Sequence, residues 1–237
     1  MLRISLRNFP IFLNYKKRRV KYERYSIMSN SKITDILCFW FGETFQDEFP
    51  PRHVSDKWYG FHPTTDSFIK DHFQVDVEAG LMGSYDDWAQ TSKGRLALII
   101  LLDQFTRHIY RNTPQAFSGD RKALALVHHP IHSSMATPLL LCEKMFYYGP
   151  LEHSEEFSDQ QKHMAIYEEI LKTTPQSICS KLEYYLYWFR VHYDVIARYS
   201  RFPWRNAILG RQSRAEEINY LKTAPDFGQN YQESVIK

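Results

Sequence analysis

The sequence predicts an all-α protein of antiparallel helix pairs, either a tetratricopeptide-like α-solenoid or a compact helical bundle. Apolar residues recur at intervals of three and four along most of the chain, as they do on one face of a helix. Almost no stretch alternates between apolar and polar residues, and no Asn-Gly or Asp-Gly turn separates two apolar runs. We find no clean sequence repeat, so any repeat is structural only.

Size and composition support one folded domain. The chain has 237 residues, 43% of them hydrophobic, which is enough for a substantial core, and its 16% of aromatic residues excludes a largely disordered protein. We expect a basic leader over residues 1–30, a single helical domain over residues 31–223 and an irregular tail over residues 224–237. The longest apolar run has seven residues, too short to cross a bilayer. The three cysteines, which lie far apart within apolar patterns, are typical of reduced core residues in an intracellular protein: Cys38, Cys142 and Cys179.

Charge is distributed unevenly along the chain. Residues 1–27 contain eight basic residues and one acidic residue, whereas the remainder contains 22 basic and 26 acidic residues. A mildly acidic domain offers no electrostatic footprint for nucleic acid, so we predict no DNA or RNA partner, and no membrane partner. Within the basic leader, an apolar helical face resembles a mitochondrial targeting segment; the alternatives are a flexible tail outside the fold, or a true start at Met28. We therefore predict a soluble cytoplasmic protein, with a mitochondrial location as the alternative.

The first two helices are predicted from their start and stop signals. Thr34 can cap the first helix, which ends at Gly42. A loop rich in proline and charge follows over residues 43–63. Thr65 then opens a second helix, which closes at Gly80.

The later helices follow in order. After a break at Gly94 a central helix is expected over residues 95–111, followed by a short helix over residues 120–129. Thr137 and Pro138 predict the start of a helix over residues 139–148. The next two helices carry apolar stripes and are followed by a last helix; capping boxes are predicted at Ser158 with Gln161 and at Ser213 with Glu216, and the longer stripe runs through Leu182, Tyr185, Leu186, Phe189, Tyr193 and Ile196.

The central helix carries the first candidate site. It is apolar nearly all round, and such a helix is normally buried. Asp103, Arg107 and Arg111 recur at every fourth residue and therefore stack along one face. A buried carboxylate beside two guanidiniums is tolerated only if it is paired or engaged with a ligand, so we take these three as candidate ligand-binding residues. An internal salt bridge that fixes helix packing is the alternative.

A second cluster lies in the turn over residues 150–156. Glu152, His153 and Glu155 place two carboxylates and an imidazole in one short loop, a composition suited to general acid–base chemistry or to metal ligation. The spacing matches no zinc signature, and we predict neither a metal nor a cofactor. The alternative is an ordinary helix N-terminus with acidic residues that complement the helix dipole. His192, among aromatic residues on a later helix, is either a further catalytic candidate or a satisfied core histidine.

A third cluster is rich in arginine. Arg201, Arg205, Asn206 and Arg211 lie in one short loop with proline and glycine, and Trp204 sits among them. Guanidiniums on a rigid turn suit the recognition of a carboxylate or phosphate, and a tryptophan can stack on a planar group. We predict that Arg201, Arg205 and Arg211 form an anion-binding rim that faces the central helix. Alternatively, these arginines only neutralise nearby carboxylates.

These three blocks resemble the mainly bacterial family catalogued as domain of unknown function 924. The matching runs are Leu-Leu-Asp-Gln-Phe-x-Arg at 101–107, Pro-Leu-Glu-His-Ser-Glu at 150–155, and Arg-Phe-Pro-x-Arg-Asn at 201–206 with Leu-Gly-Arg at 209–211. The resemblance implies an all-helical fold similar to tetratricopeptide-repeat proteins, and no established activity.

The chain departs from the pattern of this family at several positions. His108 stands where asparagine is usual, Tyr199 and Ser200 stand where phenylalanine and glycine precede the arginine, and Trp204 stands where histidine is common. If that histidine is catalytic in the family, this chain keeps the fold and the ligand site but loses the activity.

Two functions follow from the sequence. The first is an internal polar site that binds an anionic small molecule or peptide through the arginine-rich rim. The alternative is a metal-independent hydrolase or lyase-like enzyme that uses the loop at 152–155, with the arginines stabilising developing negative charge. Neither the ligand nor the oligomeric state can be read from the residues.

Overall fold

The structure, a computed structural model, describes residues 31–42, 48–129 and 138–225, and these residues form helices, turns and loops without a strand. The all-α class predicted from the sequence is therefore confirmed. The principal helices are α2 (Ser31–Phe41), α4 (Pro63–Met82), α5 (Ser92–Ile99), α7 (Asp120–His128), α8 (Leu141–Glu152), α9 (Phe157–Thr173) and α10 (Gln176–Tyr199). Shorter segments are α3 (Arg52–Ser55), η1 (Asp56–Trp58), η2 (Asp86–Gln90), α6 (Thr106–Ile109), η4 (Pro114–Phe117), η6 (Pro203–Arg205) and α11 (Ala215–Leu221).

The central helix is not one regular α-helix. It starts as α5, changes to π-helical hydrogen bonding in η3 (Ile100–Phe105) and continues as α6. The predicted break at Gly94 is wrong, because Gly94 lies inside α5 and its N–H donates to the Thr91 hydroxyl at 3.1 Å. A Cβ at this position would lie 2.4 Å from the Trp88 carbonyl oxygen, so glycine is needed for close packing, not for termination. Helices α2, α4, α7 and α8 surround the segment.

Helix α4 begins and ends two to three residues outside the predicted limits. It starts at Pro63 and passes through Gly80, and it ends at Gly83, whose φ of 93° is in the left-handed region that suits glycine. Gly80 instead faces the core, where a Cβ would contact a methyl group of Leu98 at 3.4 Å. The loop predicted between the first two helices also contains short helical turns, α3 and η1.

Several predicted capping residues are also wrong. Helix α2 starts before Thr34, at Ser31. Helix α9 starts at Phe157, so Ser158 lies inside it, and the N–H of Glu156 donates to the Ser154 hydroxyl. At α11 it is Glu217, not Glu216, that accepts the N–H of Arg214, at 2.7 Å. These differences are shifts of a few residues at helix ends, the part of a helix that local sequence signals determine least well.

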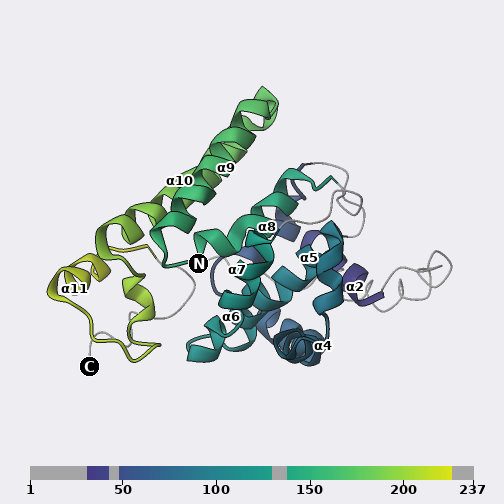
Figure 1. Cartoon of the computed structure of the whole chain (residues 1–237), viewed down its shortest axis with the longest axis horizontal. Coiled ribbons are helices and arrows are strands. Elements are labelled where there is room, and N and C mark those ends of the chain that lie inside the picture. The colour runs from purple at the N-terminus through teal and green to yellow at the C-terminus, as the bar shows by residue number, and fades with distance from the viewer. Residues whose placement is uncertain (1–30, 43–47, 130–137, 226–237) are drawn as a thin grey trace, which may run out of the picture.

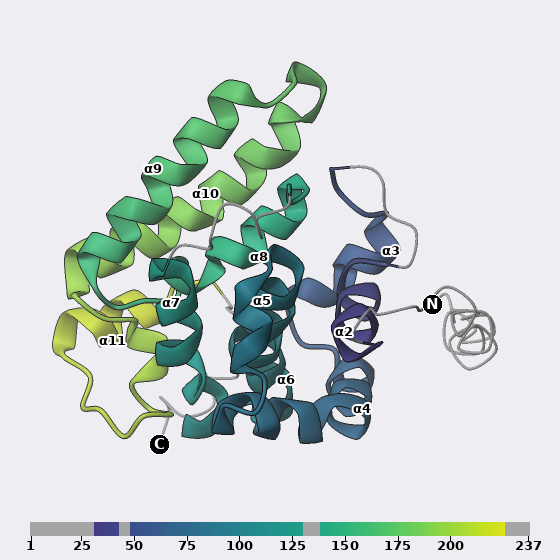
Figure 2. The same ribbon diagram turned by 45° about the vertical axis from the view of Figure 1, so that its right-hand side comes forward.

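The helices form two packed groups. In Figures 1 and 2, α9 and α10 lie side by side as an antiparallel pair that extends away from the helices around α5. Helix α8 contacts α5, α7 and α9 and so joins the two groups. The main apolar core lies around α5 and η3, a second cluster lies between α8, α9 and α10, and a third lies at the end of α10. The likeness to tetratricopeptide repeats stays a prediction.

Several expectations concern residues outside those described. The basic leader, and with it the mitochondrial alternative, lies outside them, as do Thr137 and most of the tail. The first tail residue, Ala224, is buried in the apolar cluster of Leu221 and Trp204, so the packed region extends past residue 223. No helix in the described part of the chain has the length and apolar character needed to cross a membrane.

Candidate functional site

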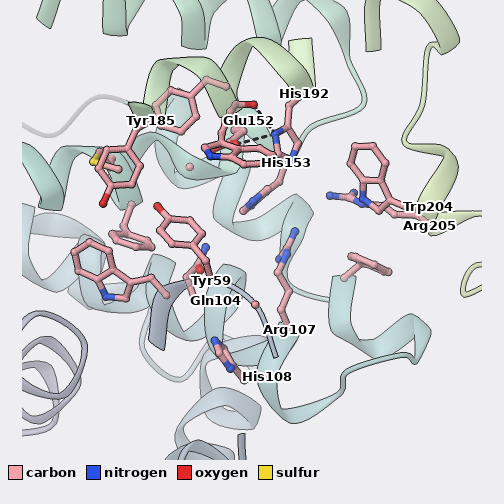
Figure 3. A pocket seen from close by; sticks show the side chains of 18 of the residues that line it. Tyr59, Gln104, Arg107, His108, Glu152, His153, Tyr185, His192, Trp204 and Arg205 are labelled. Carbon is pink, nitrogen blue, oxygen red and sulfur yellow. Dashed lines mark hydrogen bonds and ion pairs between the residues drawn. The ribbon is translucent and has the colours of Figure 1, made fainter. Parts of the chain in front are cut away.

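A cavity of about 260 Å³ lies where α8 and α10 meet the central helix (Figure 3). Six segments of the chain contribute to its wall. The polar or charged lining residues are Gln104, Arg107, His108, Arg111, Glu152, His153, His192 and Arg205. The aromatic lining residues are Trp58, Tyr59, Phe117, Phe146, Tyr184, Tyr185, Trp188, Phe189 and Trp204.

The π-helical turn positions Asp103 beneath this cavity. Its carboxylate is fully buried and accepts hydrogen bonds from His153 Nδ1 at 2.7 Å and from Gln104 Nε2 at 2.6 Å, while Arg107 Nη1 lies 3.3 Å away. Burial disfavours the charged carboxylate, but His153 and Arg107 hold the pKa of Asp103 below its ordinary value. Because Asp103 takes the Nδ1 hydrogen, Nε2 of neutral His153 is an acceptor.

Two arginines share a carboxylate beside the cavity. Arg107 makes a bidentate contact with Asp120 at 2.9 and 3.0 Å, and Arg205 approaches the same carboxylate at 3.4 Å. Arg205 is 7% exposed and lies over the rings of Phe117 and Phe202, and burial lowers its pKa to about 10. Its Nε has no hydrogen-bond partner within the described residues. Arg107 thus contacts two carboxylates, those of Asp103 and Asp120, whereas Arg205 has a more distant contact with Asp120 and keeps one donor unpartnered among the described residues.

Glu152 and His192 form a second buried pair. His192 Nδ1 lies 3.0 Å from Glu152 Oε1 and 3.0 Å from the Trp188 carbonyl oxygen. A carbonyl oxygen only accepts, so His192 Nδ1 carries the hydrogen. Burial, reinforced by Asp103, raises the pKa of Glu152 to about 8, and burial lowers the pKa of His192 to about 3. Both groups are therefore mainly neutral at pH 7.

Trp204 extends the aromatic wall. Its ring stacks on Phe202 at 4.7 Å between centroids and meets His192 edge to face at 5.7 Å. Tyr185 stacks on Phe49 from the opposite end of the wall, at 5.5 Å. The cavity thus combines flat apolar surfaces with a few charged groups, as small-molecule sites commonly do.

Four of the predicted site residues lie outside the lining and pair elsewhere. Arg201 makes a bidentate contact with Glu217 at 2.7 Å for both bonds, and Asn206 donates to the same carboxylate at 3.2 Å. Arg211 pairs with Glu155 at 2.6 and 2.9 Å, and Glu155 also accepts the N–H of Phe202. These contacts fasten the arginine loop to α11 and to the turn before α9.

The predicted rim is therefore wrong for Arg201 and Arg211, and of the three arginines in that loop Arg205 is the one that lines the cavity. Arg111 lines the cavity but is held away from Asp103 by Asp66, which it contacts at 2.7 and 2.9 Å. Asp66 also accepts from His108 Nδ1 at 2.7 Å. Asp103, Arg107 and Arg111 were predicted to stack along one face of the helix. In the structure the two arginines turn to different carboxylates, Arg107 to Asp120 and Arg111 to Asp66.

Sequence reasoning missed the two carboxylates that pair with these arginines, those of Asp66 and Asp120. Asp66 lies in the first turn of α4, where an acidic residue ordinarily needs no partner. Asp120 follows Gly119. A Cβ added to Gly119 would lie 2.1 Å from the Leu102 carbonyl oxygen. In the sequence, Gly119 before the acidic first residue of α7 is the feature that could have indicated this packing, because glycine allows a close approach of two backbones.

Within the described ranges, no three His, Cys, Asp or Glu side chains lie close enough to hold a metal ion. The fold and the cavity define an all-α protein with a buried, arginine-containing, aromatic-walled site.

The chain belongs to a family described as bacterial protein of unknown function (DUF924), whose model matches residues 36–225. A solved structure of a protein of unknown function from Agrobacterium tumefaciens, ATU0120, is similar: it has 25% sequence identity and a TM-score of 0.64, and the match covers 82% of this chain and 98% of that one. A comparison with curated proteins found no match. The resemblance seen in the three sequence blocks is therefore confirmed.

Proposed function

We propose that the cavity binds a small anionic molecule that carries an aromatic or similarly flat apolar group. The guanidiniums of Arg107 and Arg205 line the cavity, whereas the carboxylates of Asp103 and Asp120 that pair with them do not. Among the described residues, the one carboxyl group in the lining is that of Glu152, which is mainly protonated at pH 7. The lining therefore favours an anion over a cation.

Arg205 is the observation that carries this proposal. A buried guanidinium ordinarily has its donors satisfied, and Arg205 has one distant carboxylate contact and an unpartnered Nε among the described residues. A ligand carboxylate or phosphate would complete its hydrogen bonding and could contact Arg107 as well. The cavity volume of about 260 Å³ suits a small molecule and excludes a folded peptide segment, so we narrow the sequence-based expectation to a small ligand.

The first prediction tests this site with a matched pair of ligands. Benzoate should raise the melting temperature of the protein, and benzamide, which has nearly the same shape without the charge, should not. Arg205→Lys should weaken benzoate binding about tenfold, or ~1.4 kcal/mol, because lysine keeps the charge but lacks the planar fork. Isothermal titration calorimetry measures the affinities.

The control is Arg121→Lys, because Arg121 is an exposed arginine on α7 next to Asp120. This variant should bind benzoate like the wild type. Equal stabilisation by benzoate and benzamide, or unchanged benzoate affinity in Arg205→Lys, would show that the arginines are structural.

A further inference from the structure

Two groups able to transfer protons lie next to each other on one wall of the cavity. Glu152 is the last residue of α8, and His153 follows it in the turn. Both line the cavity, and Figure 3 shows Arg107 and Arg205 pointing toward them from other sides. Because they are consecutive at the end of a rigid helix, their separation from the arginines is set by the packing of α8 on the central helix.

His153 has the geometry of an oriented base. Its Nδ1–H donates to the fully buried Asp103 carboxylate, which fixes the ring and leaves the Nε2 lone pair for a proton. Asp103 is itself held by Gln104 and Arg107. A carboxylate fixed in this way also stabilises the imidazolium that forms when Nε2 takes up a proton.

Glu152 has the surroundings of an acid. Its Oε1 lies 3.0 Å from His192 Nδ1, within the buried pair described above. Burial disfavours the charged form of Glu152, and the nearby Asp103 carboxylate adds to this effect, so the pKa of Glu152 is raised and its proton is retained. A carboxyl group and an imidazole on one wall of a site are a recurring arrangement in acid–base chemistry.

The lining residues bear on the choice of nucleophile. No serine, threonine, cysteine or lysine is among them in the described part of the chain, so this wall lacks the aliphatic hydroxyl, thiol and amine groups that commonly form covalent intermediates. A water molecule activated by His153 is a nucleophile that this set of residues can supply.

We propose that the cavity hydrolyses a small carboxylic ester that carries an anionic group, with water as the nucleophile. This inference rests on the proposed function, because Arg205 holds the anionic group. His153 Nε2 removes a proton from water, whose oxygen bonds to the ester carbonyl carbon. The resulting oxyanion is stabilised by the Arg107 guanidinium.

Collapse of this tetrahedral species breaks the bond between the carbonyl carbon and the alkoxy oxygen. Glu152 gives its proton to the departing oxygen, which leaves as the alcohol. The products are one alcohol and one carboxylic acid, and His153 returns its proton through solvent to Glu152. No oxidant, reductant or further reactant is needed. In this scheme His153 and Glu152 are catalytic residues and Asp103 is a positioning residue.

A pair of esters tests the proposal. The probe is 4-acetoxybenzoate, and its matched control is phenyl acetate, which lacks the carboxylate. The wild type should hydrolyse 4-acetoxybenzoate with the higher kcat/KM. His153→Gln should lower kcat about 100-fold or more, which is typical for loss of a general base. His53→Gln alters an exposed histidine that does not line the cavity and should leave the rate unchanged.

Asp103→Asn separates positioning from structure. It should lower kcat more than it raises KM, and should slow the reaction of His153 with diethyl pyrocarbonate, which attacks neutral imidazole, without changing the reaction of His53. If Asp103→Asn does not fold, the same comparison is made with Gln104→Ala, which removes a contact to Asp103. A merely structural Asp103 would leave the reactivity of His153 unchanged in the folded protein.

The outcomes distinguish this inference from the proposed function. Stabilisation by benzoate with no hydrolysis of 4-acetoxybenzoate above the rate of His153→Gln overturns the hydrolytic inference and leaves the binding proposal standing. Absence of both overturns both. Hydrolysis that depends on His153 and is at least several-fold faster for the anionic ester supports both.

Discussion

The charged residues of this protein show how much depends on individual partners. The sequence places five arginines in its candidate clusters against three carboxylates, Asp103, Glu152 and Glu155, which predicted an anion-binding surplus. The structure supplies three more carboxylates, Asp66, Asp120 and Glu217, so the count no longer shows a surplus of arginine. What remains is local: Arg205, buried beside Arg107, has an Nε without a hydrogen-bond partner among the described residues. Burial gives this one unmatched donor more weight than it would have on the surface, where water would satisfy and screen it.

A buried histidine provides a prediction about pH. His163 is fully buried, neither ring nitrogen has a hydrogen-bond partner within the described residues, and burial lowers its pKa from 6.5 to about 3. Below about pH 6.5, His163 therefore binds a proton in the unfolded chain but stays neutral in the folded protein. Because of this lowered pKa, the contribution of His163 to the free energy of unfolding is full above pH 6.5 and is lost as the pH falls toward 3.

His163→Leu should accordingly stabilise the protein more at pH 5 than at pH 8, with a difference of roughly 1 to 2 kcal/mol. Urea denaturation at the two pH values measures it. The exposed His53→Gln serves as the control and should show the pH dependence of the wild type. If His163→Leu loses as much stability in acid as the wild type, His163 does not cause the pH dependence of the free energy of unfolding.

The junction between the central helix and α7 shows what an irregular helix contributes. The π turn of η3 carries Asp103 and Gln104 on one side and exposes the Leu102 carbonyl oxygen to α7 on another. Thr106 donates its hydroxyl to that carbonyl at 2.7 Å. Short π-helical segments interrupt the ordinary bonding pattern and often occur at functional sites. Here the interruption places the carboxylate that orients His153.

Gly119→Ala should be destabilising by about 1 to 3 kcal/mol or more, because the new Cβ would start 2.1 Å from the Leu102 carbonyl oxygen and backbone atoms must move. Gly149→Ala is the matched control. Its Cβ would meet only a carboxylate oxygen of Asp103 at 3.8 Å, an ordinary contact, so its stability should be unchanged or higher. Thermal melts of both variants decide the matter; equal stability of the two would contradict the close packing at Gly119.

The molecule as a whole places the cavity between its two helical groups. Residues from Trp58 to Arg205, distant in sequence, meet there because α8 packs on the central helix while it also supports α9 and α10. The packing of the main core therefore also sets the positions of the residues that line the cavity. A change deep in that core should weaken the fold even though it touches no lining residue.

Leu102→Ala tests this dependence. Leu102 is fully buried in the main core, and its truncation should lower the free energy of unfolding by about 2 to 5 kcal/mol. Leu209→Ala, at a position that is 36% exposed, is the control and should cost far less. Denaturant titration compares them. If the two substitutions cost the same, the central helix is not the centre of the core.

The sequence by itself determined the helical class, the burial of the central helix, the family, and the three blocks that contribute to the site. Helical periodicity is a local property, since it depends on residues three and four apart, and residues in short motifs lie close together wherever the chain goes. Glu152, His153, Arg107 and Arg205 could be named as candidates for the same reason.

Only the tertiary structure decided which charges meet. Asp120 pairs with arginines 13 and 85 residues away along the chain, and Asp66 pairs with one 45 residues away. Such distances depend on how helices pack, and the packing in turn depends on single contacts such as Gly119 against the Leu102 carbonyl oxygen. The same packing turned Arg201 and Arg211 toward Glu217 and Glu155, and left Arg205 facing the cavity.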